Sequence, residues 1–198
     1  MKRLLFFVCC SLAFFSSCAQ GVVEGGFYAE HFQLGYRSQQ SFGGILHYPV
    51  GERFTLNYQA GIGPAQQGGF YVHAPIVAVA GAMLLSRAAD VRALAALGAL
   101  ALVVPEGVGM YVGEGKLRPH ISINPLGCDY WYRRDPYEEF AKMSCSMLVR
   151  LKMRTNLSAP VYVAPQIGGV FVYTPGELTE RFGFRAGITI GFDGGPVD

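Results

Sequence analysis

The chain alternates between apolar and polar residues over several long segments. In residues 54–63, large apolar side chains occupy every second position, and Thr, Asn, Gln and Gly lie between them. Residues 142–154 and 181–192 repeat this pattern with Met, Phe and Ile on one side and Lys, Arg, Ser, Thr and Gly on the other. Residues 28–36 follow it too, except that Glu30 interrupts the apolar side. Such alternation is typical of β-strands whose two faces meet different surroundings.

The length of these segments indicates a membrane-spanning sheet. They cover about 10 to 13 residues, whereas an ordinary globular strand has about 5 or 6. A tilted strand needs about 9 to 11 residues to cross an outer membrane. Aromatic residues such as Phe54 and Phe192 end the segments, as in the interfacial girdles of membrane barrels. We therefore predict that the apolar faces contact lipid and that the Gly-rich polar faces point inward.

Turn sequences predict that successive strands are antiparallel neighbours. Pro49 and Gly51 stand in one short corner, and Gly113 and Gly115 stand in another. The candidate strands are residues 27–37, 42–48, 54–63, 107–113, 117–124, 142–154, 161–173 and 181–192. The predicted fold is mainly β, an antiparallel up-and-down β-barrel of about eight strands.

Residues 75–104 do not follow the strand pattern. This block is apolar on every face and rich in Ala, which favours helix and is depleted in strands. We predict a short Ala-rich helical hairpin inserted into the barrel domain. A further strand pair turning at Ser86 to Asp90 is the alternative, and it would raise the strand count to ten. An inner-membrane helical protein is a third interpretation.

The N-terminus has the three parts of a secretory signal peptide: a basic start, an apolar stretch and small residues. Cleavage after Ala19 makes residues 1–19 the signal peptide. In the alternative, Phe15 to Cys18 acts as a lipobox, the leader ends at residue 17, and Cys18 is lipidated. Residues 22–192 then form a single β-barrel domain, and residues 193–198 form a short tail.

Charge excludes a nucleic-acid-binding function. The chain has 16 Lys and Arg against 14 Asp and Glu, and two of the basic residues lie in the leader. No basic surface remains to attract phosphate. The four histidines are scattered without metal-ligand spacing, and no nucleotide loop or catalytic motif is present. We therefore expect no cofactor, no metal and no enzymatic activity.

Two cysteines remain outside the leader region, Cys128 and Cys145. In an exported chain such a pair is a candidate disulfide. Strict pairing of the two would place Ile121 opposite Lys152, which conflicts with the face pattern. A β-bulge at Pro125 and Gly127 would reset the register, and without one the pair is two free thiols.

Five basic residues share the polar faces of the last strands. If these faces line a lumen, the side chains are candidates to bind an anion or a lipid headgroup at one mouth. The alternative is a salt-bridged interior in which Glu30 and other carboxylates neutralise them. Side chains fill an eight-stranded barrel, so we expect no wide pore. The five residues are Arg150, Lys152, Arg154, Arg181 and Arg185.

The leader, the alternating strands and the aromatic-ended last segment, Phe182 to Phe192, resemble those of small outer-membrane β-barrel proteins of Gram-negative bacteria, of the OmpW or OmpX type. The resemblance covers about residues 22–192 and implies export to the outer membrane and contact with its lipid. It implies a structural, adhesive or small-solute role, with the extracellular or solute partner unidentified. An α+β lipoprotein that binds a small apolar ligand is the main alternative, and an acyl-modifying barrel enzyme is a third hypothesis.

Overall fold

The computed structural model describes seven segments of the chain: residues 23–35, 37–65, 69–76, 104–133, 138–154, 161–173 and 181–192. The predicted signal peptide, with Cys18, lies outside them, as do the tail 193–198 and most of the Ala-rich block 75–104. Cleavage, lipidation, the helical hairpin and the ten-strand alternative therefore stay predictions. In the described part of the chain, no helix is long and apolar enough to cross a membrane.

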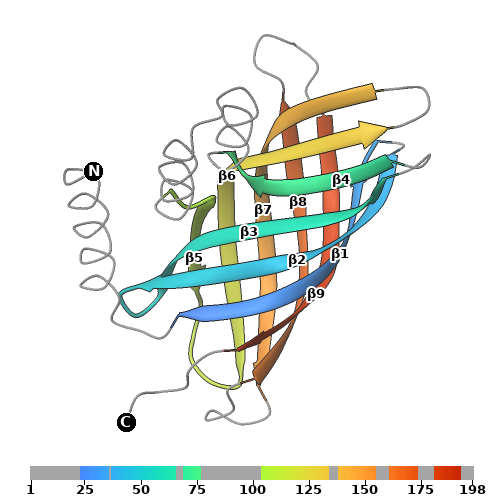
Figure 1. The fold of residues 1–198 in the computed structure, drawn as a ribbon. Coiled ribbons are helices and arrows are strands. Elements are labelled where there is room, and N and C mark those ends of the chain that lie inside the picture. The colour runs from blue at the N-terminus through green and yellow to red at the C-terminus, as the bar shows by residue number, and fades with distance from the viewer. Residues whose placement is uncertain are drawn as a thin grey trace, which may run out of the picture.

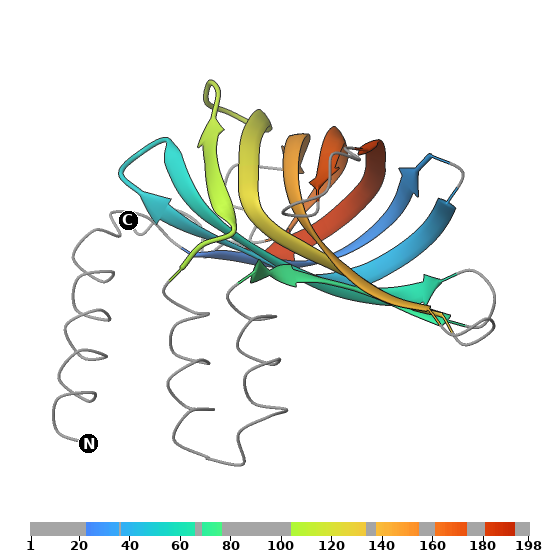
Figure 2. The ribbon, with the colours of Figure 1, turned by 90° about the horizontal axis from the view of Figure 1, so that it is seen from above.

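Nine antiparallel strands form one closed sheet (Figures 1 and 2). β1 pairs with β2 on one side and with the last strand, β9, on the other, so the sheet has no free edge between its first and last strands. The predicted antiparallel barrel is confirmed. The strands are β1 (Glu24–Leu34), β2 (Arg37–Val50), β3 (Phe54–Ala65), β4 (Gly69–Pro75), β5 (Gly107–Tyr111), β6 (Leu117–Arg133), β7 (Glu138–Arg154), β8 (Val161–Tyr173) and β9 (Arg181–Phe192).

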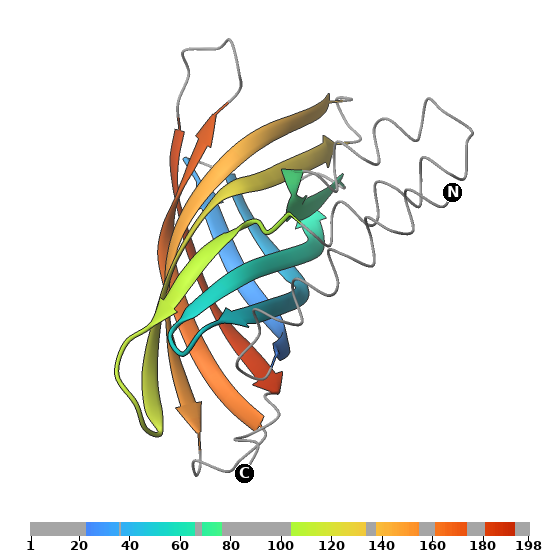
Figure 3. The same ribbon diagram turned by 90° about the vertical axis from the view of Figure 1, so that its left-hand side faces the viewer.

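β4 and β5 share one position in the wall, so the nine strands make an eight-position barrel (Figure 3). Both strands lie between β3 and β6. β4 pairs with residues 61–65 of β3 and 127–132 of β6, and β5 pairs with residues 54–57 of β3 and 120–123 of β6. Glu106 extends the β5 half between its two neighbours: its N–H donates to the Asn57 carbonyl of β3 at 2.9 Å, and its carbonyl accepts from Leu126 N–H of β6 at 3.0 Å. The chain between Pro75 and Glu106 is thus inserted within a single strand position.

Several strand boundaries differ from the predicted ones. β4 was not predicted, and residues 107–113 supply only half of a wall position. Residues 128–133, which no predicted strand included, continue β6, which pairs with β7 along most of its length. Their charged and aromatic side chains do not continue the alternation of residues 117–124. The bulge between Asn124 and Gly127 explains this, because it shifts which residues of β6 face inward.

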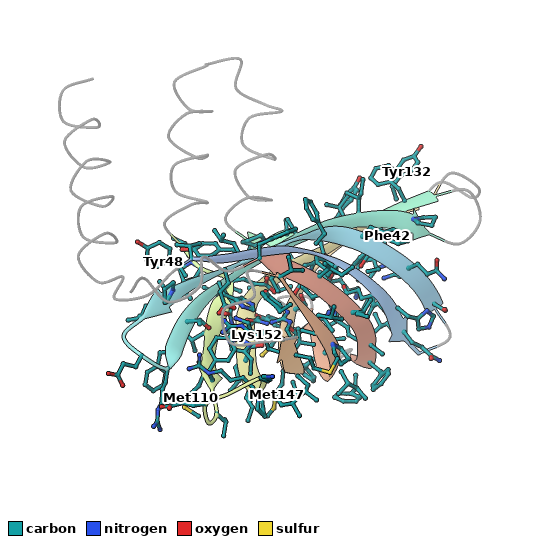
Figure 4. All side chains as sticks on the ribbon, turned by 90° about the horizontal axis from the view of Figure 1, so that it is seen from below. Phe42, Tyr48, Met110, Tyr132, Met147 and Lys152 are labelled. Atoms are coloured by element: carbon teal, nitrogen blue, oxygen red, sulfur yellow. The ribbon has the colours of Figure 1, made fainter. Side chains whose placement is uncertain are left out.

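The outer face is apolar, as predicted from β3, β7 and β9. Phe54, Ile62, Met147, Ile188 and Ile190 all have outward, exposed side chains, whereas Leu148, the exception in the β7 pattern, is buried inside. Figure 4 shows Met110, Met147 and Tyr48 outside the ring of strands and Lys152 within it. This outer surface is the part of the molecule that contacts lipid.

The predicted faces of β1 were wrong. Tyr28, Phe32 and Leu34, together with Glu30, are buried in the interior, while Phe27 is 73% exposed on the outside. Glu30 was the sign of this arrangement, because a carboxylate on a lipid-facing surface is unfavourable. The apolar residues beside it pack inside one end of the barrel and do not contact lipid.

Candidate functional site in the barrel interior

Inward-facing glycines make room for large side chains inside the barrel. A Cβ at Gly61 would lie 2.1 Å from the Tyr28 hydroxyl, and a Cβ at Gly191 would lie 2.2 Å from the Tyr162 ring. A barrel of eight positions is just wide enough to be filled by side chains. The Gly-rich inner faces seen in the sequence therefore allow tyrosines and long charged side chains to reach across the interior.

The interior is layered, beginning at the terminal end, where β1 starts and β9 finishes. In this terminal layer Lys152 Nζ donates to Glu24 Oε1 at 2.5 Å, and the Tyr111 hydroxyl donates to the same carboxylate. The Lys152 ammonium also lies 4.4 Å from the centre of the Tyr162 ring, a cation–π geometry. Each ionic group of this layer is buried together with a partner of opposite charge.

A middle layer centres on Arg150. Its guanidinium donates to Gln166 Oε1 at 2.7 Å and to Gln59 Oε1 at 3.1 Å, and it lies 3.2 Å from His47 Nε2. The His47 ring stacks on His120 with 4.6 Å between ring centres. Amides and imidazoles therefore surround this buried cation and satisfy the donors of its guanidinium group.

The third layer holds the densest ionic network. Arg185 donates to Asp129 Oδ1 at 2.9 Å and to Glu30 Oε1 at 3.3 Å, and its side chain is 1% exposed. His73 Nδ1 lies 2.8 Å from Asp129 Oδ1, and His73 Nε2 lies 3.1 Å from Glu106 Oε1. This network joins β1, β4, β6 and β9 to the residue that precedes β5.

An apolar layer closes the distal end, opposite the termini. Trp131 Nε1 donates to Gln39 Oε1 at 2.7 Å, which satisfies the indole N–H within this buried setting. Phe32 lies 5.9 Å from the Tyr71 ring and 6.2 Å from the Trp131 ring, measured between ring centres. The full apolar cluster consists of Phe32, Leu34, Tyr71, Trp131, Val170 and Val172.

The structure brings together three of the five predicted lumen cations. Arg150, Lys152 and Arg185 are buried inside the barrel, where carboxylates or amides already contact them. Arg154 is half-buried at the terminal end of β7, and the side chain of Arg181 lies outside the described residues. Binding of an anion or headgroup by these residues stays a prediction.

Cys128 and Cys145, the candidate disulfide pair, are both free in the structure. A bulge is present between Asn124 and Gly127, and it places Met143 opposite Cys128.

Sequence reasoning missed the residues that face these cations. No predicted strand included His73, Glu106 or Asp129, so no alternating pattern marked them as inward. They lie in β4, just before β5, and in the second half of β6. The bulge was a usable signal. Even-numbered residues of β6 face inward before it, and odd-numbered residues such as Asp129 and Trp131 face inward after it. Within the described ranges, no group of three or more His, Cys, Asp or Glu side chains is arranged to hold a metal.

No family model matches the chain, and no curated protein matches it at a significant level. Among solved structures, the N-terminal β-barrel domain of Pseudomonas aeruginosa OprF aligns at 13% identity and a TM-score of 0.48, covering 87% of this chain and all of that one. Neisserial surface protein A aligns at 5% identity and a TM-score of 0.47, covering 86% and 95% of the two chains. Ail, the attachment invasion locus protein of Yersinia pestis, aligns at 9% and 0.42, covering 87% and 97%.

The molecule's own surfaces identify its environment. Only a closed barrel satisfies all backbone hydrogen bonds of a sheet within lipid, and this sheet is closed through β1 and β9. Its outward side chains are mainly apolar, and its inward side chains are mainly polar or charged outside the apolar distal layer. Apolar outside and polar inside is the arrangement of transmembrane β-barrels. The chain has the architecture of an eight-position outer-membrane β-barrel protein, located in the outer membrane.

Proposed function

We propose that this protein is a structural outer-membrane barrel that passes no solute and carries out no catalysis. The observation that carries the proposal is the filled interior. Buried side chains occupy four successive layers, from Glu24 and Lys152 near the termini to Phe32 and Trp131 at the distal end. Several of these side chains reach across the barrel between strands far apart in the sequence.

The connections at the distal end favour a structural role over an adhesive one. They span residues 35–36, 66–68, 134–137 and 174–180, so the wall has little loop surface at that end. Binding residues are disproportionately found on surface loops, so short connections leave few positions for an adhesive site. A soluble or lipoprotein α+β ligand-binding domain is not favoured, because the sheet closes on itself and faces outward with its apolar side.

Two measurements test the proposal. Carbonate washing of membranes should leave the protein in the pellet, and the unheated protein should migrate differently from the boiled protein on a gel, because a closed barrel resists detergent until heated. Purified protein in a planar bilayer should give no steady conductance, with a porin measured in parallel as the positive control. Stable single-channel steps from the wild-type protein would contradict the filled interior as the basis of its role.

A matched pair of variants sharpens the conductance test. Lys152→Ala removes the ammonium that fills the terminal layer, and Lys116→Ala removes an exposed basic residue of the turn between β5 and β6. If side chains seal the barrel, only the Lys152 variant should show brief conductance. Equal conductance in both variants would indicate leakage around the wall and count against the proposal.

A further inference from the structure

His73 and Glu106 lie at the point where the wall is interrupted. Their side chains meet inside the barrel across the break, with 3.1 Å between His73 Nε2 and Glu106 Oε1. The other ring nitrogen of His73 lies 2.8 Å from Asp129 Oδ1 on β6. One imidazole therefore connects both halves of the split strand position to each other and to the neighbouring strand.

The chemistry of the three groups specifies the proton on His73. An ionised carboxylate only accepts hydrogen bonds, and a neutral imidazole has a single N–H. With both carboxyl groups ionised, the two contacts are satisfied together only by an N–H on each ring nitrogen, which is the imidazolium form. The neutral form would leave one lone pair facing Asp129 or Glu106.

The charge balance of the interior leads to the same form. The buried carboxylates are Glu24, Glu30, Glu106 and Asp129, and the buried permanent cations are Arg150, Lys152 and Arg185. Among the described side chains, four negative charges thus face three positive ones, and a proton on His73 makes the two equal. Charges buried in pairs avoid the desolvation penalty that an unpaired charge carries.

Glu106 depends on this proton more than Asp129 does. Asp129 also accepts from Arg185 and from the Tyr71 hydroxyl, so two other donors support it. Glu106 Oε1 contacts His73, and Glu106 Oε2 has no hydrogen-bond partner among the described residues. Loss of the Nε2 hydrogen would leave the fully buried Glu106 carboxylate without this donor at the break in the wall.

Arg185 provides a second arrangement for the neutral ring. Its Nη2 lies 3.3 Å from His73 Nδ1, and the same nitrogen donates to Asp129 at 2.9 Å. When Nδ1 loses its proton it can accept from Arg185, while Asp129 then faces a lone pair at 2.8 Å. The network therefore has two distinct hydrogen-bonding states, separated by one proton.

We propose that the protonation of His73 controls the contact between the two halves of the split strand position. As the imidazolium, His73 bridges Glu106 and Asp129. On deprotonation it loses the hydrogen bond to one of them, and the contact between β4 and the start of β5 weakens. The groups that face His73 are Tyr71 on its own strand, Asp129 on β6, Arg185 on β9 with its partner Glu30 on β1, and Glu106 before β5. The proposal is independent of the structural role proposed above.

The sign of the pH effect follows from this arrangement. The bridge needs an N–H on each ring nitrogen, so it is present at low pH and is lost as pH rises through the point where His73 deprotonates. A group that binds a proton only in the folded state changes the unfolding equilibrium constant by up to about tenfold per pH unit.

Urea unfolding of the full-length protein in detergent micelles tests the proposal. Trp131, the one tryptophan of the chain, is buried beside this network and reports unfolding by fluorescence. Wild-type protein should lose stability as pH rises from about 6 to about 10, and His73→Gln, which carries no titratable proton, should remove that dependence. The matched control is His120→Gln, because the His120 ring contacts the Thr55 hydroxyl and the rings of His47 and Tyr111.

A second measurement keeps the proposal testable if the His73 variant fails to fold. Nitrogen-15 NMR of histidine-labelled wild-type protein should show both His73 nitrogens protonated near neutral pH, and Glu106→Gln should shift the loss of that proton to lower pH. A neutral His73 ring at about pH 7 would overturn the proposal. So would a pH dependence of stability that survives in His73→Gln or disappears in His120→Gln.

Discussion

Arg185 provides the most direct test of the ionic interior, through the substitution Arg185→Met. The guanidinium is 1% exposed, contacts Asp129 at 2.9 Å and Glu30 at 3.3 Å, and lies 4.8 Å from the centre of the Phe32 ring. Methionine keeps much of the packing but leaves two buried carboxylates without their shared cation. Removing one partner of a buried ion pair is destabilising by about 3 to 5 kcal/mol.

The assay is urea unfolding in micelles, followed by Trp131 fluorescence and by the gel shift between folded and heated protein. The control is Lys116→Met, because Lys116 is an exposed residue of the turn between β5 and β6. We expect that control to lose about 1 kcal/mol or less. An Arg185 variant within about 1 kcal/mol of wild type would refute the view that the interior network holds the barrel together.

The remaining predictions concern the wall. Gly61→Val should destabilise the barrel by about 1 to 3 kcal/mol because its Cβ would collide with a buried tyrosine hydroxyl, whereas Gly44→Val, with no atom closer than 3.9 Å to its Cβ, should be tolerated in the same unfolding assay. Ile188→Arg should destabilise the protein in lipid vesicles by about 2 to 4 kcal/mol, and a smaller effect in vesicles than in micelles would contradict lipid contact at this outward position. Cys128→Ser and Cys145→Ser should each leave mobility on a non-reducing gel unchanged, and a slower band would reveal a disulfide.

Alternation within single strands was sufficient to predict much of the barrel. The period-two pattern of residues 54–63 and 181–192 depends on local geometry, because successive side chains point to opposite faces. Those segments have the predicted faces in β3 and β9. The antiparallel order followed from short turns such as residues 51–53. A turn this short places β3 directly beside β2 and reverses its direction.

Other features depended on contacts between distant parts of the chain. The interruption between β4 and β5 is invisible locally, because neither short piece has enough alternating residues to identify it as half of one wall position. The faces of β1 are the reverse of the predicted ones. Tyr28 points inward because a glycine of another strand leaves room for it, and Phe32 points inward because it packs against aromatic rings there. Glu30 is a local sign of the inward face, but the space that Tyr28 and Phe32 occupy is set by other strands.

The sequence by itself determined the exported barrel architecture and its lipid-facing surface, because periodicity and strand length are local properties of the chain. Only the tertiary structure decided which charges meet inside. Glu24 and Lys152 are 128 positions apart in the sequence, and Glu30 and Arg185 are 155 positions apart. Each pair is brought together by closure of β1 against β9 and by the register of the strands between them. Ring closure is a global constraint, so the partners of a buried charge follow from the whole barrel and from no single segment of it.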